Sequence, residues 1–130
     1  MIDHISLAVS DVARSKAFYE AALGAIGYRV LREFGDSVIG FGVPPKPDFW
    51  VRAGQVSVAP THVAFGVDSR ELVDDFYAAA IAAGGRDNGK PGLRPHYHPD
   101  YYGAFVFDPD GYNIEAVCRR PVCPSEEGKS

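Results

Sequence analysis

Apolar residues alternate with small or polar residues over residues 3–9, which is the pattern of a strand with one buried face. Apolar side chains then recur at helical spacing after Asp11, a good N-cap residue, and Gly27 would end this helix. Short strand patterns broken by turns follow at about 28–34, 37–43 and 48–53. The first part of the chain therefore predicts a strand, a helix and three strands.

The second part of the chain repeats the first at a constant offset of 58 residues, which aligns His4 with His62 and Phe18-Tyr19 with Phe76-Tyr77. The residues Asp68-Ser69-Arg70-Glu71 have the spacing of a capping box for a second helix. Strands are then predicted at about 86–88, 102–108 and 112–118, with a tight turn between the last two.

These patterns predict an α+β fold of two tandem βαβββ modules, about 1–55 and 59–119, within a single domain of residues 1–119. The polar, Pro-containing residues 120–130 are expected to form a loose tail.

Composition limits the partners of this domain. The formal net charge of −4 argues against nucleic acid, because phosphate contacts need a basic surface. No apolar run is long enough to cross a bilayer, so no membrane partner is expected. The only cysteines are Cys118 and Cys123, which is too few for a secreted disulfide scaffold and favours a cytoplasmic location.

Strand alternation puts three possible metal ligands on the faces that do not pack on the helices. His4 shares a face with the small Ser6 and Ala8, and His62 lies in the same environment in the second unit. Glu115 faces away from the bulky residues of the last strand. A solvated histidine or a solvent-facing glutamate is the simpler explanation of each residue alone. Together, two imidazoles and one carboxylate form a ligand set for Fe, Mn, Ni or Zn with positions left open for substrate.

The chain resembles the vicinal-oxygen-chelate superfamily of glyoxalases, bleomycin-resistance proteins and extradiol dioxygenases over residues 1 to 119. The resemblance is carried by Ile2-Asp3-His4-Ile5, Thr61-His62-Val63-Ala64-Phe65 and the stretch from Asp108-Pro109-Asp110-Gly111 to Glu115. It implies that each module curls into half of a barrel, that the two halves enclose a metal site at His4, His62 and Glu115, and that the protein is a homodimer.

The ligand set departs from glyoxalase I, which has a further glutamate on the fourth strand of the first unit. Here that strand carries Phe49 and Trp50, and Asp48 is the only acid nearby. The remaining three ligands resemble those of extradiol dioxygenases, which are usually longer chains.

Residues 88–102 lack regular periodicity and combine histidine, tyrosine, arginine and proline. Long irregular segments in small domains are commonly functional. Arg94 is a candidate for holding a substrate carboxylate, and His98 or Tyr102 for moving a proton. A rigid surface loop is the alternative interpretation.

The leading hypothesis is a divalent-metal-dependent enzyme on a small oxygen-rich substrate, either a glyoxalase-like lyase or isomerase, or a dioxygenase. The rival is a metal-free protein of the bleomycin-resistance type that sequesters a small molecule. A third possibility is an intact fold whose ligand set has lost its chemistry.

Overall fold

The computed structural model describes residues 1–59 and 61–121 and contains two βαβββ modules in an α+β fold, as predicted. Module one consists of β1 (Ile5–Val9), α1 (Val12–Gly24), β2 (Arg29–Phe34), β3 (Val38–Gly42) and β4 (Phe49–Ala53). Module two consists of β5 (His62–Gly66), α2 (Arg70–Ala82), β6 (Arg86–Leu93), β7 (Tyr102–Phe107) and β8 (Asn113–Cys118). Each module forms its own mixed four-stranded sheet, in the orders β1-β4-β3-β2 and β5-β8-β7-β6.

The 58-residue repeat is confirmed in the helices, because the bounds of α1, shifted by 58, are the bounds of α2. Asp11 caps α1 through a hydrogen bond from the Arg14 amide, as predicted. The second cap differs from the prediction: Ser69, rather than Asp68, accepts from the amide of Leu72. A hydroxyl at position 69 lies three residues before that amide, which is the spacing that an N-cap needs.

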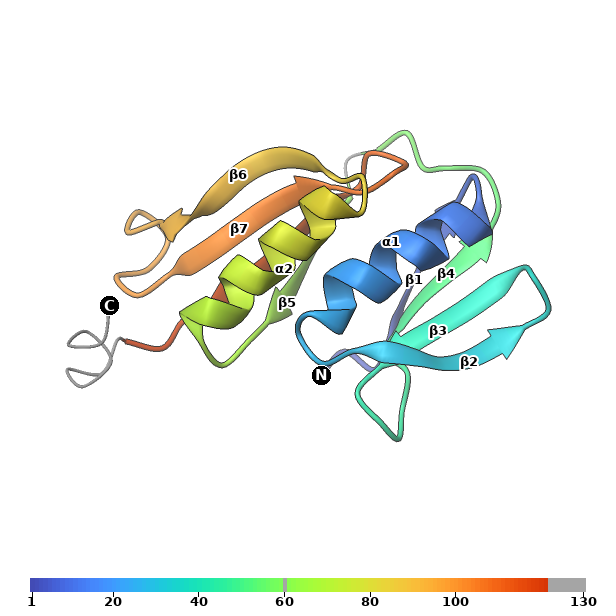
Figure 1. The fold of residues 1–130 in the computed structure, drawn as a ribbon, viewed down its shortest axis with the longest axis horizontal. Helices are drawn as coiled ribbons and strands as arrows, with labels where there is room; N and C mark the ends of the chain where they lie inside the picture. The colour runs from blue at the N-terminus through green and yellow to red at the C-terminus, as the bar shows by residue number, and fades with distance from the viewer. Residues whose placement is uncertain (60, 122–130) are drawn as a thin grey trace.

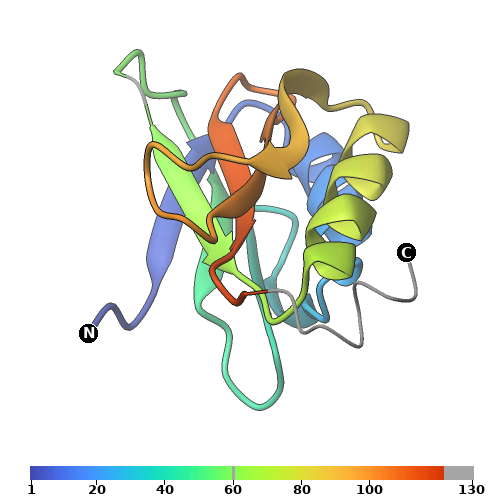
Figure 2. The same cartoon turned by 90° about the vertical axis from the view of Figure 1, so that its left-hand side faces the viewer.

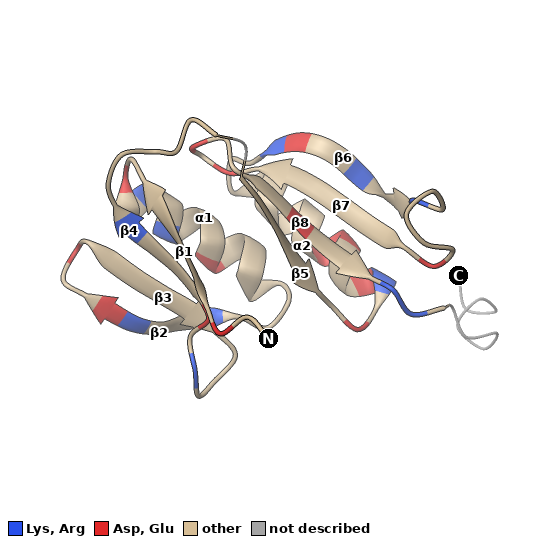
Figure 3. Ribbon diagram, turned by 180° about the vertical axis from the view of Figure 1, so that it is seen from behind, with Lys and Arg blue, Asp and Glu red and all other residues tan. Residues whose placement is uncertain are grey.

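Both helices lie on the same side of the two sheets (Figures 1 and 2). Residues of alternate strand positions, such as Leu7 and Val9 on β1, pack against the helices and form the core. The other face of each sheet, which we call the open face, carries no helix; both open faces are seen in Figure 3. The alternation therefore fixes which side chains can line a site.

The turn before β8 holds the two modules together. Asp108 is buried and its carboxylate accepts hydrogen bonds from the hydroxyl of Tyr19 on α1 and from the amides of Asp110 and Tyr112. Burial raises the pKa of Asp108, and these hydrogen bonds oppose the shift. The hydroxyl of Tyr112 donates to the carbonyl of Ala8 at 2.6 Å. These hydrogen bonds of Asp108 and Tyr112 fix the start of β8, and with it the position of Glu115.

β6 is longer than predicted, because its pairing with β7 continues to Leu93 through register shifts around Gly89 and Gly92. Glycine at position 89 permits the positive φ of 150° that this irregular edge contains. The irregular segment is therefore residues 94–101 rather than 88–102. Cys118 is a buried free thiol, whereas Cys123 and the predicted tail beyond residue 121 lie outside the described residues.

Within the described parts of the chain, no helix has both the length and the apolar character needed to cross a membrane.

Candidate functional site

Glu115 lies in the middle of the second sheet, between Ala64 of β5 and Phe105 of β7 in the strand register. Its side chain is fully buried, although it projects from the open face. Gly103 on β7 makes this possible, because a Cβ there would come within 3.2 Å of Oε2 of Glu115. A buried carboxylate is costly unless it is paired or hydrogen-bonded, so its neighbours define the site.

His62 is the first partner of Glu115. Nε2 of the imidazole lies 2.7 Å from Oε1 of the carboxylate, the distance of an N–H donating to a carboxylate oxygen. The side chain of His62 is 50% exposed, whereas Glu115 has no exposed surface. Two of the three predicted metal ligands therefore lie in contact, with the imidazole between the buried carboxylate and solvent.

Tyr101 is the second partner, and the sequence analysis did not single it out. Its hydroxyl donates to Oε2 of Glu115. Burial, followed by the hydrogen bond to Glu115, raises the pKa of Tyr101 to about 12, so the phenol stays protonated at neutral pH. Strand alternation carried one residue beyond β7 would have put Tyr101 on the face of Gly103 and Phe105, which is the open face.

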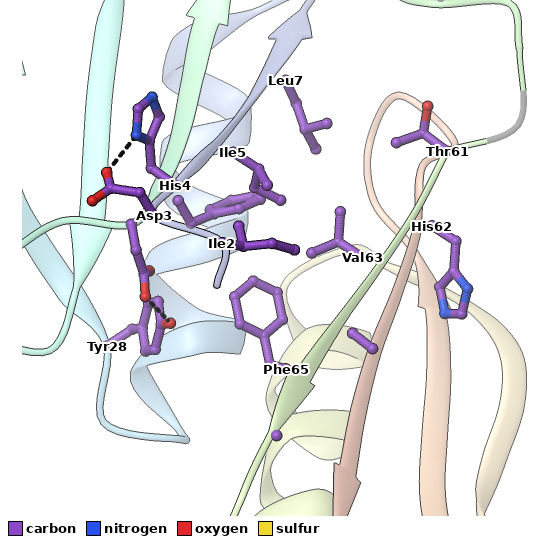
Figure 4. Close-up of a pocket in the computed structure, with 14 residues that line it drawn as sticks. Ile2, Asp3, His4, Ile5, Leu7, Tyr28, Thr61, His62, Val63 and Phe65 are labelled. Atoms are coloured by element: carbon purple, nitrogen blue, oxygen red, sulfur yellow. Dashed lines mark hydrogen bonds and ion pairs between the residues drawn. The ribbon is translucent and has the colours of Figure 1, made fainter.

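His4 does not reach this pair within one chain. Its Nδ1 lies 2.8 Å from Oδ1 of Asp3, and its side chain is 57% exposed. Figure 4 shows the imidazoles of His4 and His62 on opposite sides of a pocket and turned away from each other. In the part of the chain that the structure describes, no cluster of three or more histidine, cysteine or acidic residues is arranged to hold a metal.

Two hollows border the pair. The larger, of about 530 Å³, lies between β1 and β5 and is mostly apolar; it includes both His4 and His62 in its lining (Figure 4). The smaller, of about 360 Å³, is the one that reaches Glu115, and its lining residues are His62, Tyr97, Tyr101, Phe105, Glu115 and Arg119. The smaller hollow is therefore the one that borders both His62 and Glu115, and we treat it as the candidate site.

The expected difference from glyoxalase I is visible on the fourth strand of module one. Trp50 occupies the open face there, lies over Gly40 and stacks on Phe34 with ring centroids 6.0 Å apart. Asp48 accepts a hydrogen bond from the hydroxyl of Tyr28, 3.0 Å away, beside the larger hollow. Neither residue lies among those that line the smaller hollow beside Glu115.

The structure separates the three residues predicted to act on substrate. Arg94 lies over the ring of Phe105, 5.5 Å from its centroid, and is thus close to the site. Nδ1 of His98 accepts from the amide of Asp100, a local turn contact.

Tyr102 projects from the opposite face of the sheet, where its hydroxyl donates to Oδ1 of Asp74 on α2 at 2.7 Å. The expected place of Tyr102 near the site is thus taken by Tyr101, because adjacent residues of a strand point to opposite faces.

Comparison with known proteins agrees with this fold. The chain is similar to a glyoxalase/bleomycin resistance protein from Albidiferax ferrireducens T118, with 32% identity, a TM-score of 0.79, and coverage of 90% of this chain and 98% of that one. A glyoxalase/bleomycin resistance protein/dioxygenase family enzyme from Burkholderia phytofirmans PsJN has 21% identity and a TM-score of 0.71, over 92% of this chain and 98% of that one. A lactoylglutathione lyase from Agrobacterium tumefaciens has 16% identity and a TM-score of 0.67, over 91% and 92%.

Among proteins with curated functions, none matches this chain. The last two structures are too distant in sequence to indicate more than the fold. The family profile, in contrast, matches residues 1–116, which is nearly the whole described chain. On this match, and on the two modules described above, the chain belongs to the Glyoxalase/Bleomycin resistance protein/Dioxygenase superfamily.

Proposed function

We propose that this protein is a divalent-metal-dependent enzyme acting on a small oxygen-rich substrate, with glyoxalase-like or dioxygenase-like chemistry. The observation that carries the proposal is the contact of 2.7 Å between the half-exposed imidazole of His62 and the buried carboxylate of Glu115. A carboxylate that only served solubility would lie at the surface, and one that only served packing would be replaced by an apolar residue.

The residues fit a divalent metal in part. One imidazole nitrogen and one carboxylate oxygen meet at the edge of a hollow, which is the donor chemistry of Fe, Mn, Ni and Zn sites. The other carboxylate oxygen accepts from Tyr101, so it is held by an outer hydrogen bond of the kind that orients metal ligands. Among the described residues of one chain, no third ligand joins this arrangement.

The third ligand is assigned to His4 of a second copy. His4 is exposed on the open face of module one, and among the described residues its imidazole has a hydrogen bond only to the exposed Asp3. The open face of module one could cover that of module two in a symmetric homodimer, which would form two equal sites. The homodimer is thus part of the proposal and is required for its complete ligand set.

A bound metal would polarise two adjacent oxygens of a substrate and stabilise the negative charge that develops on them. The chain's own residues would position the reaction around it. Tyr101 stays protonated and keeps Oε2 of Glu115 occupied, which leaves Oε1 beside the imidazole of His62. Arg94 supplies a positive charge above Phe105, and His98 stays a candidate for proton transfer from the neighbouring turn.

Metal content tests the proposal. Protein purified without chelator or affinity-tag metal should contain about one Fe, Mn, Ni or Zn per chain by elemental mass spectrometry. His62→Ala should lose it. His96→Ala is the matched control, because His96 is exposed and contacts Tyr97 outside the pair.

The proposal is contradicted if the wild-type protein contains no metal and shows no thermal shift with any of these four ions. Equal metal content in His62→Ala and His96→Ala would also contradict it.

A second candidate function, metal-free sequestration of a small molecule, is favoured by one observation. Phe34 is 58% exposed and stacks on Trp50 at an interplanar angle of 18°, which forms an aromatic platform on the open face of module one. Such platforms bind flat or cationic molecules without chemistry. A protein without metal that binds an aromatic cation, and loses it in Trp50→Ala, would favour this candidate.

A further inference from the structure

Three arginines lie in a row on the open face of module two, each above an aromatic ring. Arg119 lies over Tyr101, Arg94 over Phe105 and Arg86 over Phe107, with guanidinium carbons 5.0, 5.5 and 5.0 Å from the ring centroids. The three rings project from the same face at alternate positions along β7 and just before it. This row, which we call the arginine row, runs beside Glu115.

None of the three arginines forms an ion pair with an acidic residue among residues 1–59 and 61–121. The ion pairs of arginine and lysine that the structure contains lie elsewhere and join Arg14 to Asp110, Lys16 to Glu33, Lys46 to Asp3, and Arg120 to Asp68. The chain as a whole carries a formal charge of −4. The arginine row thus places unpaired positive charges beside the candidate site of an otherwise acidic protein, and such charges attract anions.

Two members of the row, Arg94 and Arg119, differ in whether their guanidinium groups already have hydrogen-bond partners. Arg94 donates from Nη1 to the carbonyl of Gly92 at 2.7 Å and from Nη2 to that of Lys90 at 2.8 Å, so it is a fixed positive charge. Arg119 is exposed, lines the smaller hollow, and has no hydrogen-bond partner among the described residues. Its planar fork is the geometry that binds two oxygens of one carboxylate.

The position of Arg119 relates it to the candidate metal ligands. Its guanidinium lies over the ring of Tyr101, and the hydroxyl of that same tyrosine is bonded to Glu115. A molecule in the hollow would therefore have His62, which covers the buried Glu115, at one end and Arg119 at the other.

We propose that the substrate of this site carries a carboxylate next to the oxygens that a metal would hold, and that Arg119 binds this carboxylate. Arg94 adds a fixed positive charge and does not bind the group directly. The metal-held oxygens of this substrate rest on the proposed function. The binding of a carboxylate by Arg119 does not. The sequence analysis assigned the carboxylate to Arg94. Because the Arg94 guanidinium already donates to two backbone carbonyls, we assign this role to Arg119 instead.

A pair of small probes tests this without turnover. Glycolate has a hydroxyl next to a carboxylate, and glycolamide has the same shape without the charge. Titration of each probe into chelator-treated protein is followed by nuclear magnetic resonance of the arginine Nε–H groups. Glycolate should shift the Arg119 signal and glycolamide should leave it unchanged, because only glycolate offers a charged, bidentate acceptor.

The matched variants are Arg119→Leu and Arg120→Leu, which change neighbouring exposed arginines. Arg119→Leu should weaken glycolate binding about tenfold, since a charge-assisted bidentate pair is lost. Arg120→Leu should change it less than about twofold, since Arg120 pairs with Asp68 away from the hollow.

Equal glycolate affinity in the two variants, or no glycolate binding in the wild type, overturns the proposal. Tighter binding of inorganic phosphate than of glycolate would overturn the carboxylate assignment in favour of a phosphoryl group. Metal content, measured on each variant before chelator treatment, separates this proposal from the proposed function. Arg119→Leu should retain its metal and His62→Ala should lose it. The carboxylate proposal and the metal proposal can therefore be contradicted independently.

Discussion

The two modules share one strand pattern and carry opposite chemistry on their open faces. Ser6 and Ala64 are equivalent at the 58-residue offset, and their partners in the parallel pairs are Trp50 and Glu115. The same structural position therefore holds a half-buried indole in one module and a buried carboxylate in the other. The two copies therefore share a backbone pattern and differ in the chemistry of their equivalent positions.

The neighbouring strand shows the same exchange. Gly40 lies opposite Trp50, and a Cβ there would come within 2.6 Å of the indole, whereas Phe105 lies opposite Glu115. Module one uses a small residue to hold a large ring, and module two uses a large ring and Gly103 to enclose an acid. The comparison indicates that module two holds the paired His62 and Glu115, whereas module one contributes an aromatic surface and, in the proposed dimer, the third ligand His4.

Substitution by glutamine at the equivalent positions 115 and 50 should give the largest difference in metal binding between the two modules. Glu115→Gln should weaken metal binding by more than about 100-fold, because the carboxylate is a direct ligand in the proposed site. Trp50→Gln should change metal affinity by less than about twofold, because the indole is not a metal ligand. Metal titration monitored by calorimetry measures both. Equal losses would break the assignment of the chemistry to module two.

Removal of the Tyr101 hydroxyl tests how the buried acid is supported. Tyr101→Phe leaves an oxygen of Glu115 without its donor, and the free energy of unfolding should fall by about 2 kcal/mol. Tyr97→Phe is the control, because the Tyr97 ring contacts Tyr101 while its hydroxyl has no partner among the described residues. It should change stability by less than about 0.5 kcal/mol in chemical denaturation. Similar values for both variants would contradict the role of the hydrogen bond.

Substitution of Gly40 tests how module one holds the Trp50 indole on its open face. Gly40→Ala should lower the free energy of unfolding by about 1 kcal/mol, because the new methyl group displaces the indole of Trp50. Since Trp50 is the only tryptophan, its fluorescence emission should shift at the same time. Gly66→Ala, where a Cβ meets nothing within 4 Å, should do neither. An unchanged emission in Gly40→Ala would mean that the indole does not rest on this strand.

The pH dependence of Tyr101 is the subtlest expected effect. Its pKa is raised from 10.0 to about 12, so the folded state holds this proton more tightly than the unfolded state does. The stabilisation is therefore complete below about pH 10 and is lost as the pH rises toward 12. The difference in ultraviolet absorbance between wild type and Tyr101→Phe should titrate near pH 12. A midpoint at 10 would show that the phenol is not buried against Glu115.

Much of the fold could be predicted because local patterns determine it. The helix bounds follow from the repeat, and the Asp11 cap follows from residue type. The face of Glu115 follows from alternation along β8, and the structure confirms it. The end of β6 was missed because its glycines and Pro91 give no period-2 pattern, while backbone pairing to β7 still continues.

The site was only partly predictable, for two physical reasons. Tyr101 and Tyr102 are adjacent and of the same residue type, so the sequence does not distinguish them. Only the exact start of β7 decides which one faces Glu115. Alternation also gives the face of His4 within its own sheet, but not the position of one sheet relative to the other. The separation of His4 from His62 therefore needed the tertiary structure.

Complementation between two variants tests the central claim most directly, namely that one metal site combines His62 and Glu115 of one chain with His4 of another. His4→Ala and His62→Ala should each bind no metal alone. Mixed in equal amounts, unfolded and refolded together, they should recover about a quarter of the wild-type metal, because half of the dimers then contain one intact site. No recovery in mixed dimers, with metal retained by His4→Ala alone, would contradict the claim.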